Sequence, residues 1–295
     1  MAFDVTKLPA YVEQNKLPLI AEAVLKGKSV NLFNLQTGIK TKATINIINT
    51  DPTLQAGGCG WNAEGDVVFS QREIETGLVK VNMSFCNKNL LAAYTQYAVK
   101  AGLESDAVAF EEYFTAQIVE KVKAAIEKSV WQGDKASDDE NLNKIDGLIK
   151  ILGAAEGVVK PSVAEGATAF EKVKAAYMAI PEQILDKAVV MVGADLFREY
   201  TQELMEKNLY HYPANGVSEI MIAGTNTKLI ALNGLNGTGA VVAGALDNFY
   251  FGCDMVADSE EFDVWYSKDN QEHRLAMSFN YGVQVAFPNE VVYLA

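Results

Sequence analysis

One long amphipathic helix constrains the fold of this chain more than any other segment. Apolar side chains recur at a four-residue spacing, which is the pattern of a helix with one buried face. Ser105-Asp106 precede the pattern and suit the N-cap, and Trp131-Gln132-Gly133 ends it, with Gly133 suited to a left-handed C-cap. About 25 residues at about 1.5 Å each predict a rod of roughly 37 Å, which is long for a domain. The stripe comprises Phe110, Phe114, Ile118, Val122 and Ile126, joined by Val119 and Ala125.

Two alternating patterns upstream of this helix predict a β-hairpin. Apolar and polar residues alternate over 68–74 and again over 79–85, on either side of a turn at Glu75-Thr76-Gly77. Another alternating run begins at Lys42 and is broken by Asp51-Pro52. A two-stranded hairpin is marginal by itself in water, so it needs a face to lie on, either in its own domain or on another subunit.

The remaining segments predict a mixed α+β chain. The first forty residues predict an extended arm with one short helix at 19–25, and residues 142–166 predict a loop because Pro161 excludes a helix through it. Helical and strand patterns then alternate from Thr168, which indicates a compact mixed lobe. In that lobe we expect helices at 168–177 and 195–207, a short helix at 181–185, and strands at 188–192, 219–222, 228–232, 240–245 and 249–255. The tail predicts strands at 262–266, 275–279, 283–287 and 291–294.

Composition and charge exclude several classes of protein. The 295 residues are 49% hydrophobic and 21% charged, within the globular range, so disorder and coiled coil are excluded. A net charge of -13 argues against a phosphate-binding surface, because nucleic-acid affinity comes mostly from lysine and arginine. No apolar run approaches the roughly 18 residues of a membrane span, and the N-terminus lacks a signal peptide pattern, so we expect a soluble chain made in a cytoplasm.

Signatures of chemistry are missing from the sequence. The cysteines Cys59, Cys86 and Cys253 are far apart, and His211 and His273 are the only histidines, so neither a disulfide framework nor a metal site is expected. No phosphate-binding loop, dinucleotide-binding fingerprint or nucleophile elbow occurs. We therefore expect no catalytic, metal-binding or cofactor-binding residues.

The order of the segments resembles that of the tailed-phage major capsid proteins of the HK97 fold, most closely those of phages that infect Bacteroidetes. The similarity covers most of the chain. It is carried by Gly-Cys-Gly-Trp before the predicted hairpin, by Trp131-Gln132-Gly133-Asp134 at the end of the helix, and by Asp146-Gly147 beyond it. It is also carried by Phe69-Ser70-Gln71-Arg72-Glu73-Ile74, Lys80-Val81-Asn82, Phe85-Cys86 and Gly282-Val283-Gln284-Val285-Ala286-Phe287.

The resemblance implies an α+β capsid fold with five parts. They are an N-terminal arm at 1–40, an E-loop hairpin with flanking strands at 41–90, a P-domain spine helix with the following loop at 91–166, an A-domain at 167–256, and a terminal β segment at 257–295 that returns to the P-domain. The E-loop hairpin is expected around Trp61 to Phe85 and the spine helix at Asp106 to Trp131.

The resemblance also implies which residues matter. The hairpin supplies the candidate inter-subunit contacts Trp61, Phe69, Arg72, Ile74, Val79, Val81 and Met83. The structural motif at the helix end comprises Trp131, Gly133, Asp134, Asp146 and Gly147. An arm with little core of its own and a hairpin that cannot bury both faces alone are what a subunit offers when its neighbours complete it.

The expected function is a structural one, in the virion. The chain would assemble with itself as pentamers and hexamers, in the host bacterial cytoplasm, into an icosahedral head that encloses double-stranded DNA without binding it specifically. A separate scaffolding protein is expected, because the chain starts almost directly at the arm, together with a portal, decoration proteins and no membrane partner.

Two alternatives stay open. The first is an encapsulin-like nanocompartment shell, because a shared fold does not fix function. The second is a small-molecule enzyme that uses the mixed lobe, with the Asn233 to Gly239 loop as its site, although no nucleophile, base and orienting group can be named together there.

Overall fold

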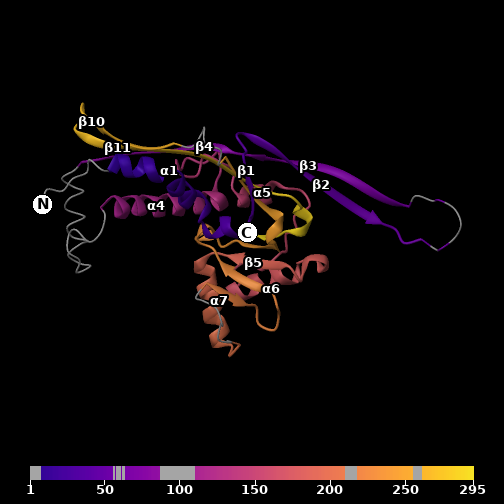
Figure 1. Ribbon diagram of the computed structural model, residues 1–295. Helices are drawn as coiled ribbons and strands as arrows, with labels where there is room; N and C mark the ends of the chain where they lie inside the picture. The colour runs from indigo at the N-terminus through magenta and orange to yellow at the C-terminus, as the bar shows by residue number, and fades with distance from the viewer. Residues whose placement is uncertain are drawn as a thin grey trace.

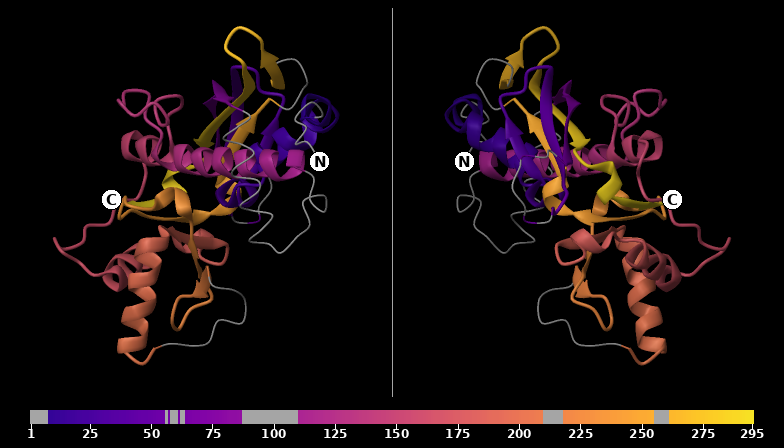
Figure 2. Two further views of the ribbon diagram at one scale, coloured as in Figure 1. Left: turned by 90° about the vertical axis from the view of Figure 1, so that its left-hand side faces the viewer. Right: turned by 90° about the vertical axis from the view of Figure 1, so that its right-hand side faces the viewer.

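The computed structural model describes residues 8–55, 57, 61, 64–86, 110–209, 218–254 and 261–295. The described residues form an upper layer of sheet over helices, a second lobe below it, and a two-stranded hairpin that projects to one side (Figure 1). The views of Figure 2 show the second lobe hanging below the long helix. Cys59, His211 and the first residues of the expected spine helix lie outside the described residues.

The upper sheet is built around one long central strand, β11. In its first part β11 pairs antiparallel with β10 on one side and with β4 on the other, and its last part pairs with β9. The tail strands expected at 275–279 and 283–287 are therefore one continuous strand. The members of this sheet are β1 (Asn34–Thr37), β4 (Gly77–Phe85), β9 (Phe249–Cys253), β10 (Glu261–Ser267) and β11 (Glu272–Val285).

Two helices support this sheet. The spine helix α4 spans Phe110–Gln132 and buries Ile118, Val122 and Ile126, which confirms the centre of the predicted stripe. Ala125, which was expected to join the stripe, is exposed. The helix α1 (Leu8–Leu25) packs against α4 and β10. Both helices contribute to the same core as the sheet.

The first forty residues were predicted to form an extended arm with one short helix at 19–25; the helix is present within α1, but the extended form of residues 8–18 is wrong. Residues 8–25 are helical, and Leu8, Ile20 and Val24 are fully buried. The helical pattern was obscured because Asn15 has non-helical dihedral angles and Pro18 follows it, so two short helical pieces meet at a kink. The segment therefore packs on the core of its own chain.

The second lobe is the mixed α/β unit that the sequence predicted. Its sheet has the order β12-β8-β5-β7-β6, and α6 and α7 pack with it. Its members are β5 (Ala188–Val192), β6 (Glu219–Met221), β7 (Lys228–Ala231), β8 (Val241–Ala245), β12 (Val292–Leu294), α6 (Ala169–Met178) and α7 (Ala194–Glu206). Two strands lie across the expected boundaries, since β9 belongs to the upper sheet and the terminal β12 pairs with β8 in this lobe.

The structure contains a β-hairpin, but its two strands are not the pair that the sequence pattern predicted. β2 (Lys42–Pro52) pairs antiparallel with β3 (Gly65–Glu75), whereas β4 pairs with β11 nearly 200 residues further on. β3 and β4 run nearly end to end (Figure 1). No reversal occurs at Thr76 because its N–H donates to the Thr41 carbonyl at 2.9 Å, which holds the end of β3 beside the start of β2.

Short elements complete the chain. The segment 142–166, predicted as a loop, contains a two-turn helix, α5 (Leu148–Ala154), that buries Leu148 and Leu152. It escaped prediction because seven residues are too few to show helical periodicity. The others are α2 (Lys28–Leu32) and the 3-10 turns η1 (Glu182–Ile184), η2 (Asn233–Leu235), η3 (Leu246–Asn248) and η4 (Pro288–Glu290).

Candidate assembly surface

The β2–β3 hairpin is apolar on one face at its root. Ile45, Ile47 and Ile74 point to the same side, because Ala43 lies opposite Ile74 and Ile45 opposite Arg72 in the register. Together with Ile39 and Ala286 they form a small separate core. The opposite face of the root is polar, with Gln71 donating to Asn46 at 3.0 Å and an ion pair between Lys42 and Glu73. The root thus makes its apolar contacts and its polar contacts within its own chain.

The distal half of the hairpin reverses this pattern. Ile48 lies opposite Phe69 and Thr50 opposite Val67, so Ile48, Val67 and Phe69 share the face that is polar at the root. Their exposed fractions are 58%, 52% and 73%, respectively. A contiguous apolar face that its own chain leaves exposed marks an interaction surface. We call Ile48, Val67 and Phe69 the distal cluster.

The root holds the hairpin rigidly to the upper sheet. The Arg72 guanidinium donates to the Val285 carbonyl at 3.2 Å, and the Gln284 amide donates to the Glu73 carbonyl at 2.8 Å. Gly282 permits the close crossing, because a Cβ at that position would lie 2.1 Å from the Glu75 carbonyl oxygen. The hairpin is therefore presented as a fixed arm.

The structure divides the seven predicted contact residues into three groups. Trp61 and Phe69 lie in the projecting part, with Trp61 95% exposed. Ile74 is fully buried, and half-buried Arg72 donates a hydrogen bond to the Val285 carbonyl, so both side chains make contacts within their own subunit. Val79, Val81 and Met83 lie on β4, which is not part of the hairpin at all.

The β4 residues line a groove between the sheet edge and the spine helix. The groove has a volume of about 450 Å³. Its apolar lining includes Val79, Val81, Ile118, Val122 and Phe279. Sequence reasoning placed Val79 and Val81 near a contact surface, but it missed the helix residues, because the pairing of β4 with β11 is what brings β4 over α4.

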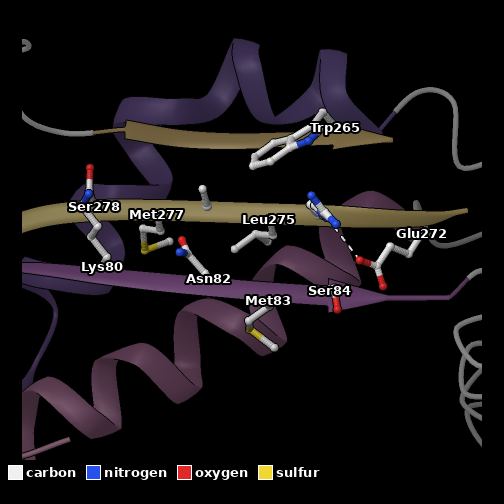
Figure 3. Close-up of a pocket in the computed structure, with 11 residues that line it drawn as sticks. Lys80, Asn82, Met83, Ser84, Trp265, Glu272, Leu275, Met277 and Ser278 are labelled. Carbon is white, nitrogen blue, oxygen red and sulfur yellow. Dashed lines mark hydrogen bonds and ion pairs between the residues drawn. The ribbon is translucent and has the colours of Figure 1, made fainter. Parts of the chain in front are cut away.

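A second, more polar trough lies on the outer face of the same sheet (Figure 3). Trp265, Arg274 and Ser84 come from three adjacent strands, and Arg274 pairs with Glu272 at 3.2 Å. Small side chains such as Ser278 on β11 leave the trough open, with a volume of about 490 Å³. Trp265 is 41% exposed at its border. No sequence signal singled out this face.

Trp131, at the end of the spine helix, joins three parts of the molecule. Its side chain is fully buried and its indole N–H donates to Ser29 Oγ at 2.7 Å. The Ser29 N–H and hydroxyl in turn donate to the Glu127 carboxylate. Burial raises the pKa of Glu127, although the Ser29 hydrogen bonds and nearby Lys28 oppose the shift. Lys28 donates to the Ala231 carbonyl at 2.7 Å, so the network reaches the second lobe.

Gly133 and Gly147 permit a close backbone crossing just beyond the helix. The Gly147 N–H donates to the Gly133 carbonyl at 2.8 Å, and a Cβ on Gly133 would lie 2.6 Å from the Ile145 carbonyl oxygen. Gly133 does not have a positive φ, so the predicted left-handed C-cap is wrong. Glycine is required at this position because the close backbone crossing leaves no room for a Cβ, and not because the backbone needs a positive φ.

Asp134 and Asp146 fasten the same crossing from outside. Lys150 pairs with Asp134 at 2.6 Å and with Asp146 at 2.7 Å. The hydrogen bond from Lys150 lowers the pKa of Asp134. The Asp146 carboxylate also accepts from the Lys135 N–H at 3.0 Å. The five predicted motif residues thus lie together in one structural junction.

The loop proposed as an enzyme site is part of this junction. Gly234 is buried, and a Cβ on it would lie 2.3 Å from both the Glu127 carbonyl oxygen and Trp131 Cδ1. Gln132 donates to the Gly234 carbonyl at 2.6 Å. The loop therefore joins the second lobe to the spine helix through Gly234.

His273, on β11, is buried against Phe85, and burial lowers its pKa.

The described residues contain neither a cluster of metal ligands nor a membrane-spanning helix. No group of three or more histidine, cysteine, aspartate or glutamate side chains there lies close enough to hold a metal ion. No helix in the described part is long and apolar enough to cross a membrane.

Comparison with known proteins identifies the fold. The sequence matches no protein-family model and no curated protein. A chain of the satellite phage P4 procapsid, which includes the size determination (Sid) protein, is similar with a TM-score of 0.66 and 13% identity over 98% of this chain and 95% of that chain. The capsid of an empty GTA particle gives a TM-score of 0.59 at 13% identity, over 92% and 89% of the two chains.

A third similar structure is the virus-like particle from Pyrococcus furiosus. It gives a TM-score of 0.53 at 11% identity, over 95% of this chain and 98% of that chain. At identities this low the likeness concerns the fold, and it extends over nearly the whole chain. The chain has the α+β, HK97-like capsid fold that the sequence predicted.

Proposed function

We propose that this chain is the major capsid protein of a tailed bacteriophage, a structural protein without enzymatic activity. Its copies would assemble as pentamers and hexamers into an icosahedral head. The observation that carries the proposal is the full-length capsid fold together with a projecting hairpin whose distal cluster its own chain leaves exposed. A subunit with such an arm is completed by its neighbours.

The parts of the fold take the roles that the resemblance implies. The projecting β2–β3 hairpin is the E-loop, and α4 with the upper sheet is the P-domain. The lobe of β5 to β8 with α6 and α7 is the A-domain, joined to the spine through Trp131 and Gly234. These assignments shift the boundaries, since β9 goes to the P-domain and β12 to the A-domain.

The remaining partners follow from this role. A scaffolding protein, a portal and decoration proteins would act with the chain in the host cytoplasm, and the finished shell would enclose double-stranded DNA. The net charge of -13 supports enclosure without specific binding, because an acidic protein does not hold phosphates. An encapsulin-like compartment is not favoured, because most of the similar solved structures come from phages or GTA particles.

The test is the assembly state of the purified full chain, by light scattering and negative-stain electron microscopy. We expect closed shells, or rings of five and six copies that close into shells when a scaffolding protein is supplied. A strictly monomeric or dimeric chain under every condition, scaffold included, would overturn the proposal. Shells that co-purify with a cargo enzyme in place of DNA would favour the compartment.

A further inference from the structure

We propose that the outer trough, which Trp265, Arg274 and Lys80 line on the upper sheet, is a binding site for a neutral oligosaccharide. Trp265 would stack on one sugar ring, and the polar side chains of the trough would bind the hydroxyl groups. The site would add glycan recognition to the structural role of the chain. The inference does not depend on the proposed function, because it concerns a surface of the single subunit.

The trough offers side chains to a ligand and no free backbone groups. Its floor lies on the central strand β11, which is hydrogen-bonded to β10 on one side and to β4 on the other over residues 273–278. Leu275 and Met277 alternate with the floor residues and are buried in the core. An extended peptide binds by adding to a free sheet edge, so this surface does not suit that mode. A ligand here must be recognised by side chains.

Small residues open the trough between two larger ends. Trp265 lies opposite Arg274 at one end, and Lys80 lies beside Ser278 at the other (Figure 3). Ala276 lies between them on β11, and its methyl group fills little of the space. From Arg274 to Ser278 the strand rises by roughly 13 Å, at about 3.3 Å per residue. This span and the volume of about 490 Å³ accommodate a short oligosaccharide.

Trp265 supplies a platform for a sugar ring. Its side chain is 41% exposed at the border of the trough. One face of a pyranose ring carries C–H groups, which pack on the flat face of an indole. The indole face is electron-rich and attracts these slightly positive hydrogens. Trp265 would therefore provide the main apolar contact with the ligand.

The polar groups of the trough include both donors and acceptors. Arg274 Nε donates to Glu272 at 3.2 Å, and Glu272 also accepts from Asn270 at 3.4 Å and from the Ser84 hydroxyl. These bonds fix the guanidinium, and within the described residues they engage only its Nε, so both Nη groups can donate to a ligand. The Asn82 amide can donate and accept. Sugar hydroxyls, which do both, match this set.

The charges favour a neutral ligand. Lys80 and Arg274 line the trough together with Glu272, and exposed Asp263 lies beside Ala276 in the register. Charges of both signs therefore share this face, so a polymer of phosphates or carboxylates would meet repulsion as well as attraction. The net charge of -13 adds to the repulsion of polyanions. A neutral oligosaccharide does not meet this repulsion.

Binding of defined trisaccharides to the purified full chain tests the proposal. The probes are maltotriose, cellotriose and mannotriose, which are neutral, and trigalacturonic acid, which is acidic; each is titrated by calorimetry. We expect at least one neutral probe to bind, and Trp265→Ala to weaken its binding at least ten-fold. Trp61→Ala is the matched control and should bind like wild type, because it removes a tryptophan that is 95% exposed between β2 and β3.

A second variant blocks the trough and leaves Trp265 in place. Ala276→Leu puts a larger side chain on the floor, so it should abolish binding while the melting temperature stays nearly unchanged. Ala124→Leu, the same change on the exposed side of α4, should leave binding unchanged.

Three results would overturn the proposal and leave the shell function standing. They are no binding of any neutral probe or tighter binding of the acidic one, equal binding by Trp265→Ala and wild type, and loss of binding when subunits assemble, which would assign the trough to a contact between copies. A chain that binds a neutral trisaccharide but never assembles would instead overturn the proposed function alone.

Discussion

Substituting Gly133 by alanine should destabilise the subunit, and the structure allows the size of this loss of stability to be worked out. The added Cβ would lie 2.6 Å from two backbone oxygens, those of Ile145 and Ser129, and 3.1 Å from the Gly147 nitrogen. None of these atoms is the end of a flexible side chain, so the crossing beyond the spine helix must open. Overpacking of this kind costs about 1–3 kcal/mol.

The free energy of unfolding should fall by about 2 kcal/mol net, because both close contacts are with backbone atoms that cannot move aside easily. Alanine offsets part of the overpacking cost, up to about 1 kcal/mol, because it loses less backbone entropy on folding than glycine does. At about 2–4 °C per kcal/mol for a chain of this size class, the melting temperature should fall by about 4 °C or more. Gly153→Ala is the matched control. Gly153 lies inside the helix α5 with nothing within 4 Å of an added Cβ, so alanine there should stabilise by about 0.5–1 kcal/mol.

The assay is urea unfolding of the unassembled subunit, followed by tryptophan fluorescence because Trp131 lies at the affected junction. The two glycine-to-alanine variants should shift the midpoint in opposite directions. If Gly133→Ala raises the midpoint as Gly153→Ala does, the close crossing is not the reason for glycine at position 133.

Three further outcomes are expected. Trp131→Phe should lower the free energy of unfolding by about 1–3 kcal/mol in the same titration, because Ser29 loses the indole donor and a cavity remains; an unchanged value would show that the network contributes nothing. Since the folded pKa of Glu127 is raised above 4.5, the folded state binds that proton more tightly, so wild-type stability should fall relative to Glu127→Gln as the pH rises from about 4.5 toward neutral; parallel pH profiles would contradict this. Phe69→Ser should leave the melting temperature within about 1 °C but abolish shells in electron microscopy, and intact shells would exclude Phe69 from the contact.

Local sequence patterns were sufficient to predict those helices and strands that do not depend on neighbouring elements for their form. The spine helix shows four turns of apolar spacing, and the strand at Ala188–Val192 is apolar throughout because both its faces are buried. These elements and the lobe of alternating helices and strands followed from the sequence directly. The helix α1 did not, because Asn15 and Pro18 divide its pattern into pieces too short to recognise.

The partners of the strands could not be predicted from local sequence patterns. The alternation over 68–74 and 79–85 is correct, but it carries no information about which strand lies alongside. The partner of β4 is β11, and Gly282 of β11 makes room for the chain to pass straight from β3 into β4. The same limit explains the assembly surface, since Phe69 was identified from sequence, whereas the groove between β4 and α4 exists only through that distant pairing.

The most direct test of the central claim is cryo-electron microscopy of particles formed by the full chain. The account predicts closed icosahedral shells of five- and six-membered rings, with each β2–β3 hairpin reaching the neighbouring subunit and its distal cluster covered there. Particles in which the distal cluster stays exposed to solvent, or a chain that forms no closed particle even with scaffold, would contradict it.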